Sequence, residues 1–207
     1  MRTLKVLVVA SVVLVALAPS ILAATAGGGD QNNIFRGGLF WSHPTGDLNL
    51  GGFKFEADDD FGIQASYERK FNDLLGLNLN IGYVEYDVKI KGGGLDDTFA
   101  KQPTLPVSLN LLFHPLENKQ QVDWYIGGGL TYVQYDDADV ESPFKAFAGS
   151  DTIKSDNDTA FSAQTGVDIK FGDGTWALNF DLQYIHTSAD DLDIDPFNFG
   201  AGVAIRW

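Results

Sequence analysis

The sequence predicts an all-β protein, an eight-stranded antiparallel transmembrane up-and-down β-barrel preceded by a cleavable signal peptide. Three observations carry this prediction. Eight segments alternate apolar and polar residues with a period of two, their connections alternate between long and short, and the aromatic residues of the apolar faces fall into two belts. A period of two gives a strand with two unlike faces. A barrel in lipid needs an apolar outer face on every strand and a closing strand that pairs with the first.

Composition agrees with a single β-rich domain. The chain has 207 residues, of which 23 are glycine and 13% are aromatic, which suits twisted strands and tight turns. It has no cysteine, so it contains neither a disulfide framework nor a thiolate metal site. The formal charge is −14 and no basic stripe appears, so nucleic acid is not expected as a partner.

Residues 1–26 have the pattern of a secretory signal peptide and leader. Arg2 and Lys5 precede an apolar run at 6–18, and small residues follow Pro19. We expect cleavage after Ala23 or Ala26, which leaves 27–207 as the barrel domain with 12 basic and 28 acidic residues. The apolar run is short for a spanning helix, so an uncleaved anchor is the less favoured interpretation.

The first four predicted strands are 34–41, 61–71, 77–88 and 104–113. In the first, Phe35, Leu39 and Trp41 share a face opposite Arg36. The next two place apolar and aromatic residues opposite glutamine, serine, glutamate and asparagine. In the fourth, the odd positions from Leu105 to Phe113 are apolar. Pro106 removes one ladder donor from this strand, which marks a bulge or a local opening.

The last four predicted strands are 123–135, 160–171, 175–186 and 196–207. The fifth carries three consecutive glycines, Gly127, Gly128 and Gly129, which permit sharp curvature. The sixth and seventh are joined by a tight hairpin turn at 172–174. The eighth has a fully apolar face that ends at Trp207. We expect mid-membrane, lipid-facing residues on several strands: Leu79, Leu109, Ile126, Leu178 and Val203.

The long connections are 43–60, 90–102, 136–158 and 187–195, and the short ones lie between them. We expect the long ones to be polar loops, with one helical turn near 144–147. Outward aromatic residues near the short-turn side form one belt: Phe35, Tyr67, Phe113, Trp124, Phe171, Trp176 and Trp207. Those near the long-loop side form another: Trp41, Phe61, Tyr83, Tyr132, Phe161, Tyr184 and Phe197. Two belts are typical of two membrane interfaces.

Several segments resemble the OmpW-like group of small outer-membrane barrels, within the wider OmpA/OmpX-type class. The segments are 71–77, 105–110, 124–132 and 195–197, together with the terminal aromatic residue. The resemblance implies an integral protein of the outer membrane of a Gram-negative-type bacterium. It implies passive, non-catalytic transfer of small hydrophobic molecules through a narrow lumen and a lateral opening. It also implies that Trp207 belongs to the signal read by the outer-membrane assembly machinery.

Inward charges predict how the lumen is filled. An eight-stranded barrel leaves an interior just wide enough for side chains, and buried charges need partners. We interpret six charged residues, most of them near the short-turn end, as a polar plug: Arg36, Glu68, Asp168, Lys170, Asp181 and Arg206. The alternative is a charged ion path. We expect apolar residues such as Val84, Val133 and Ile185 to line the long-loop half, with an opening between the strands that carry Pro106 and Gly127, Gly128 and Gly129.

Other candidate sites are weaker. Acidic clusters in the loops could hold a divalent cation that bridges to lipopolysaccharide, but they show no complete ligand series, so a solvated loop surface is favoured. His186 and Ser188 resemble the His-x-Ser of lipid A deacylase barrels without the residues that would complete the site. His43 and His114 stand alone in connections. No cofactor is expected. A structural or surface-interaction barrel of the OmpX type is the main alternative function, and a lipid-modifying enzyme is a distant third.

Overall fold

The computed structural model describes residues 32–116, 121–187 and 195–207. The predicted signal peptide at residues 1–26 lies outside the described residues. No helix in this part of the chain is long and apolar enough to cross a membrane.

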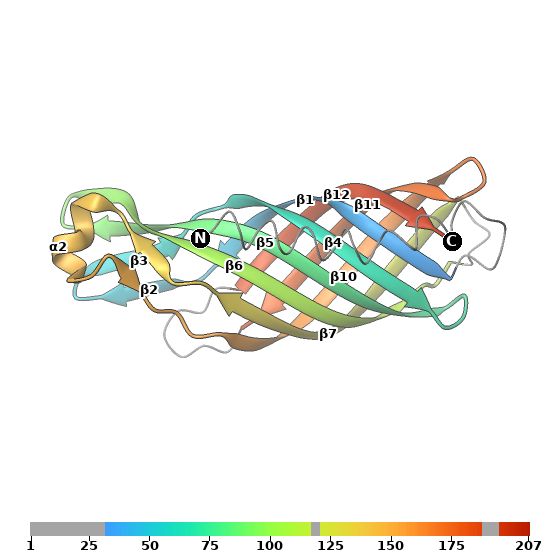
Figure 1. Cartoon of the computed structure of the whole chain (residues 1–207), viewed down its shortest axis with the longest axis horizontal. Helices are drawn as coiled ribbons and strands as arrows, with labels where there is room; N and C mark the ends of the chain where they lie inside the picture. Colours follow the sequence, from blue (N-terminus) through green and yellow to red (C-terminus); the bar gives the residue numbers. More distant parts are fainter. Residues whose placement is uncertain (1–31, 117–120, 188–194) are drawn as a thin grey trace.

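Eight strands close into an antiparallel barrel (Figure 1), which confirms the predicted fold class. They are β1 (Asn33–Thr45), β4 (Asp60–Lys70), β5 (Leu75–Gly92), β6 (Leu95–Phe113), β7 (Val122–Tyr135), β10 (Asp158–Phe171), β11 (Trp176–His186) and β12 (Asp195–Arg206). Each pairs with the next along the chain. β12 then pairs with β1 from Ile34↔Arg206 to Thr45↔Asp195 and closes the ring.

The two faces of the strands follow the predicted parity. The lipid-facing residues proposed from the sequence, Leu79, Leu109, Ile126, Leu178 and Val203, are 41–51% exposed on the outer surface. The residues beside them point inward and are buried, as Asn78, Asn110 and Asn179 illustrate. An apolar outer face and a polar inner one are what lipid demands of a barrel.

Two of the predicted long loops are strands instead. The first contains β2 (Asp47–Leu50) and β3 (Phe53–Ala57), and β3 pairs with β5. The second is the outer end of the β5–β6 hairpin, which pairs as far as Gly92↔Leu95. The prediction was wrong here because these strands reverse the membrane pattern. Ile90 points inward and is buried, while Lys89 and Lys91 on either side of it face outward.

The third long loop is also partly ordered. It contains β8 (Ala138–Val140), the 3₁₀ turn η1 (Ser142–Phe144), the short helix α2 (Lys145–Ala148) and β9 (Thr152–Ile153). The predicted helical turn is therefore confirmed. We call β2, β3, the outer β5–β6 hairpin, β8, η1, α2 and β9 the cap, which lies at the left end of the barrel in Figure 1.

The cap has its own hydrophobic core. Ile90 and Phe99 of the hairpin pack with Val140 and with Phe144 of η1, and Phe53 and Phe55 of β3 pack against them. The Phe99 ring lies 5.3 Å from Phe55 and 5.7 Å from Phe144 between ring centroids. On the outer surface Lys54 and Lys91 both bond Glu56, and these two hydrogen bonds lower the pKa of its carboxyl group.

Candidate functional site

The lumen of the short-turn half is filled by a ring of six alternating charges. Arg36 Nη1 lies 2.8 Å from Glu68 Oε2, and its Nη2 lies 2.8 Å from Asp168 Oδ2. Both carboxylates are fully buried and the guanidinium is 5% exposed. The Cζ atom of Arg36 also lies over the buried Tyr125 ring, 4.6 Å from its centre.

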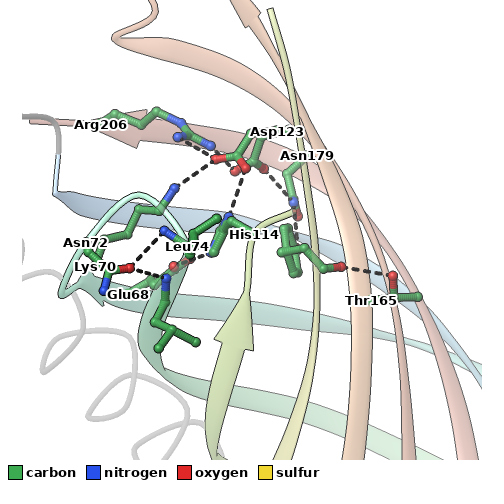
Figure 2. Close-up of polar contacts among 12 residues, drawn as sticks. Glu68, Lys70, Asn72, Leu74, His114, Asp123, Thr165, Asn179 and Arg206 are labelled. Carbon is green, nitrogen blue, oxygen red and sulfur yellow. Dashed lines mark hydrogen bonds and ion pairs between the residues drawn. The ribbon is translucent and has the colours of Figure 1, made fainter. Parts of the chain in front are cut away.

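The other side of the ring is built around Asp123 on β7. Figure 2 shows Arg206, Lys70 and His114 converging on this carboxylate. Arg206 Nη1 lies 2.9 Å from Asp123 Oδ2, and Arg206 Nη2 lies 2.5 Å from Asp168 Oδ2. Lys70 Nζ lies 3.4 Å from Asp123 Oδ2.

His114 closes the ring. Its Nδ1 lies 2.8 Å from Asp123 Oδ1 and its Nε2 lies 2.7 Å from Glu68 Oε1, with all three side chains fully buried. Each carboxylate also accepts from an arginine, so both are ionised acceptors, and both ring nitrogens must then donate. We therefore expect His114 to be an imidazolium cation. The expectation that His114 stands alone was wrong, because the strand parity turns its ring into the lumen.

The six members of the ring come from six different places in the barrel wall. They are Arg36, Glu68, His114, Asp123, Arg206 and Asp168, in bonded order. β1, β4, β7, β10, β12 and the turn after β6 are thereby joined across the lumen. Buried charges are stable in a protein when charge-assisted hydrogen bonds leave few of their polar atoms without a partner.

Two of the six charges proposed for the plug lie outside this ring. Asp181 on β11 accepts a hydrogen bond from Gln64 Nε2 at 2.8 Å, and its Oδ2 has no partner among the described residues. It borders a small polar cavity together with Asn80 and Tyr125. Lys170 is buried near Asp123 and Asp168.

Sequence reasoning missed His114, Asp123 and Lys70. Each continues the inward parity of a strand whose outward residues were recognised. Asp123 and Tyr125 alternate with Trp124 and Ile126, and His114 follows Phe113. The signal was therefore present: Lys70 and Asp123 lie within the predicted strands 61–71 and 123–135, and His114 lies one residue past the end of 104–113.

The long-loop half of the lumen is largely apolar. Val84, Val133 and Ile185, proposed as lining residues, are 1–3% exposed and point inward. They border a second cavity that also touches Pro106 and Tyr86. The cavity has a volume of about 10 Å³, which is room for one water molecule. Any larger molecule must displace part of the wall.

The β5–β6 ladder is interrupted beside this cavity. The register is the same on both sides, from Ile81↔Val107 to Val84↔Thr104, but the two pairs between them are missing. Pro106 explains both. It has no N–H for the carbonyl of Gly82, so neither the Gly82/Pro106 pair nor the neighbouring Tyr83/Leu105 pair can form fully. We call these two pairs the seam.

The three glycines of β7 do not form part of an opening. β6 pairs with β7 without interruption from Thr104↔Tyr135 to Phe113↔Ile126. Hydrogen-bonding groups alternate sides along a strand, and the missing donor of Pro106 would face β5, not β7. A Cβ on Gly127 or Gly129 would collide with the carbonyl of Leu111 or Leu109, and one on Gly128 would lie 2.7 Å from Ser162 O. The expected gap between these strands was wrong, because these glycines permit close approach.

The remaining candidates lie at the long-loop end. His43 Nδ1 lies 2.6 Å from Asp59 Oδ1 at the surface, so His43 does have a partner. His186 Nδ1 lies 2.9 Å from Asp195 Oδ2, and Ser188 lies outside the described residues. Within the described ranges no three His, Cys, Asp or Glu residues are grouped so as to hold a metal ion.

Comparisons with known proteins fit this geometry. The model of the outer membrane protein β-barrel domain family matches residues 10–206. The crystal structure of outer membrane protein OprG from Pseudomonas aeruginosa is 21% identical, with a TM-score of 0.74 over 87% of this chain and 98% of OprG. Neisserial surface protein A is 15% identical, with a TM-score of 0.57 over 87% and 100%. AlkL in lipid bilayers is 16% identical, with a TM-score of 0.56 over 87% and 93%. None of the curated proteins matches this chain.

Proposed function

The chain belongs to the outer membrane protein β-barrel domain family and is an integral outer-membrane protein, and from this premise we propose that it passively transfers small hydrophobic molecules from outside the cell into the outer membrane. The transfer is non-catalytic. The observation that carries the proposal is the seam, an interrupted ladder that borders an apolar section of the lumen.

The charge ring sets the direction of transfer. A hydrophobic molecule that reached the ring would leave apolar side chains such as Val84 and Ile185 and meet six buried charges. It would gain nothing there to replace its apolar contacts. The route of lowest free energy is therefore sideways into lipid. The seam is the place where parting the wall breaks the fewest ladder bonds, because Pro106 has already removed one.

The seam can be closed reversibly with a disulfide. Tyr83 and Leu105 face outward on opposite strands and form the missing outward pair. The chain contains no cysteine, so the double variant Tyr83→Cys/Leu105→Cys carries only these two thiols. In vesicles with lipopolysaccharide in the outer leaflet, we expect oxidation to slow uptake of a radiolabelled hydrophobe and reduction to restore it.

The matched control is Leu79→Cys/Leu109→Cys, which joins the same two strands where the ladder is intact. Its oxidation should leave uptake unchanged. Uptake by the unmodified barrel no faster than in protein-free vesicles would remove the transfer proposal. Steady conductance of small ions in planar bilayers would also contradict it, because the charge ring should close the lumen to ions.

A second candidate function is a surface-interaction barrel, and the ordered cap favours it. The cap is held in one shape by the packing of Phe99, Phe144 and Val140. Transfer of a solute would not require such an ordered cap. On its outer face lysines are paired with carboxylates, as in Lys89–Asp58 and Lys101–Asp87. Such a face can contact the charged groups of lipopolysaccharide. Removal of the cap with retained hydrophobe uptake and lost lipopolysaccharide binding would favour this second function.

A further inference from the structure

The cavity beside the seam contains hydrogen-bonding groups within an apolar lining. Asn198 on β12 and Tyr86 on β5 border it together with Val84, Val133 and Ile185. Asn198 is 4% exposed and Tyr86 2% exposed. Polar groups at this depth need partners, so their hydrogen bonds indicate what the cavity accepts.

The two hydrogen bonds of Ser42 determine which group donates in each. Ser42 Oγ donates to Asn198 Oδ1 at 2.6 Å. A hydroxyl has one hydrogen, so the 2.6 Å contact between Ser42 Oγ and Tyr86 Oη must be donated by Tyr86. Tyr86 Oη and Asn198 Oδ1 are both satisfied in this way.

The amide nitrogen of Asn198 remains. Its two N–H donors have no bonded partner among the described residues, although the side chain is almost fully buried. The hydroxyl of Tyr135, which also borders the cavity, has no side-chain partner in the described ranges either. A donor in an apolar cavity favours an oxygen acceptor from outside the chain, since leaving it unpaired costs free energy. The acceptor is either the one water molecule for which the cavity has room or the oxygen of a molecule that displaces this water.

We propose that the molecules accepted by this cavity carry one hydroxyl or carbonyl oxygen on an otherwise apolar body, as medium-chain alcohols and ketones do. The oxygen accepts from Asn198 Nδ2, and the apolar body lies against Val84, Val133 and Ile185. This inference rests on the proposed transfer function and narrows its substrate class. Pure hydrocarbons can pass the seam, but they leave the Asn198 amide unpaired.

The discrimination should be modest and measurable. One hydrogen bond between neutral groups contributes about 0.5–1.5 kcal/mol, so an alcohol should be favoured over the alkane of equal length by about twofold to tenfold. A purely apolar site would not favour the alcohol over the alkane once the partitioning of each compound into lipid has been subtracted.

The experiment compares 1-octanol with octane. The full-length protein is placed in vesicles with lipopolysaccharide in the outer leaflet, and initial uptake of each radiolabelled compound is corrected for its uptake by protein-free vesicles. We expect faster corrected uptake of 1-octanol. In nanodiscs, 1-octanol should shift the side-chain amide NMR signal of Asn198, and octane should leave that signal in place.

Two variants test the residues. Asn198→Leu should remove the preference for 1-octanol while octane uptake persists. Tyr135→Phe removes a single oxygen, should fold normally and should reduce the preference. Tyr132→Phe is the matched control, because Tyr132 is on the same strand but faces outward. Equal corrected uptake of both compounds, or an unchanged preference in Asn198→Leu, would overturn this inference and leave the transfer function standing. No corrected uptake of either compound would remove both.

Discussion

His114 Nε2 lies 2.7 Å from Glu68 Oε1, which ties the turn after β6 to β4, a strand that β5 separates from β6. Four of the six contacts in the charge ring likewise join parts of the wall that do not pair with each other, whereas Arg36–Glu68 and His114–Asp123 join neighbours. Replacing His114 with leucine leaves two buried carboxylates each short of a donor. We expect this to cost about 3–5 kcal/mol of unfolding free energy in a urea titration in lipid vesicles.

The control for this variant is His43→Leu. His43 also contacts a carboxylate, Asp59, but both side chains are more than 40% exposed. An exposed pair contributes about 0–1 kcal/mol, so the control should unfold nearly as the parent does. The charge of His114 can be measured separately: at neutral pH the ¹⁵N shifts of its ring should report a proton on both nitrogens. A neutral ring would contradict the closed ring of alternating charges.

An arginine at Leu109 tests which face meets lipid. Leu109 is 51% exposed on the outer surface. Arginine at the bilayer midplane costs about 2–4 kcal/mol, and we expect a loss of this size in a folding titration. Asn80→Ala on the inner face should cost less, because the Oδ1 atom of Asn80 has no partner in the described part of the barrel. An equal loss of stability in the two variants would contradict the assignment of faces.

Pro106→Val restores the donor that the seam lacks. The new N–H faces the carbonyl of Gly82, and a net gain of about 0.5–1.5 kcal/mol is expected for the added hydrogen bond. Hydrophobe uptake should slow at the same time, because the wall is then harder to part. Pro103→Val is the control, since Pro103 already has its ladder pair with Glu85. A stabilised variant with undiminished uptake would show that the seam is not the route.

Deleting Trp207 should reduce assembly into the outer membrane without reducing synthesis. Trp207 exchanges two backbone hydrogen bonds with Asn33, at 3.0 and 3.1 Å, at the point where the barrel closes. Its ring lies 6.3 Å from Tyr67 between centroids. Trp207→Phe keeps the backbone bonds and an aromatic ring, so it should assemble better than the deletion. The measurement is the amount of folded, heat-modifiable protein in isolated membranes. A normal amount from the truncated chain would disprove the assembly role.

Cleavage after Ala23 or Ala26 stays a prediction, because those residues lie outside the described part of the chain. Mass spectrometry of the protein extracted from membranes should find a mature chain that begins at Ala24 or Gly27. Detection of Met1 in that preparation would show that the segment is retained.

The membrane part of the fold was predictable because lipid imposes one rule on every strand. Leu79, Leu109 and Val203 alternate with polar residues, and this alternation gives both faces. The alternating long and short connections then indicate an up-and-down strand order. The cap obeys no such rule. There Ile90 is buried against Phe99 while the lysines on either side of it face water. This is the alternation of a strand in a soluble sheet, and the polar composition of the segment resembles that of a loop. Only packing between distant segments decides the outcome.

The charge ring was predictable in part for a similar reason. Arg36, Glu68, Asp168 and Arg206 are charged residues within clear strands, so their inward direction follows from parity. His114 lies just beyond a strand, and its direction follows only once the turn is placed. The missing pairs at the seam were also assigned to the wrong side of Pro106. Strand parity gives the direction of a side chain, whereas the side on which a backbone N–H points depends on the pairing register.

The length of β5 and β6 has a consequence for how the cell surface meets this protein. These strands have 18 and 19 residues, whereas about 9–11 residues suffice to cross a bilayer. The remainder of the hairpin extends beyond the membrane, and the hydrophobic core of the cap keeps it rigid. Its tip brings together residues from β3, β6 and η1 that are far apart in sequence. An antibody or phage that binds this tip should therefore recognise the folded hairpin and fail to bind any linear peptide from it.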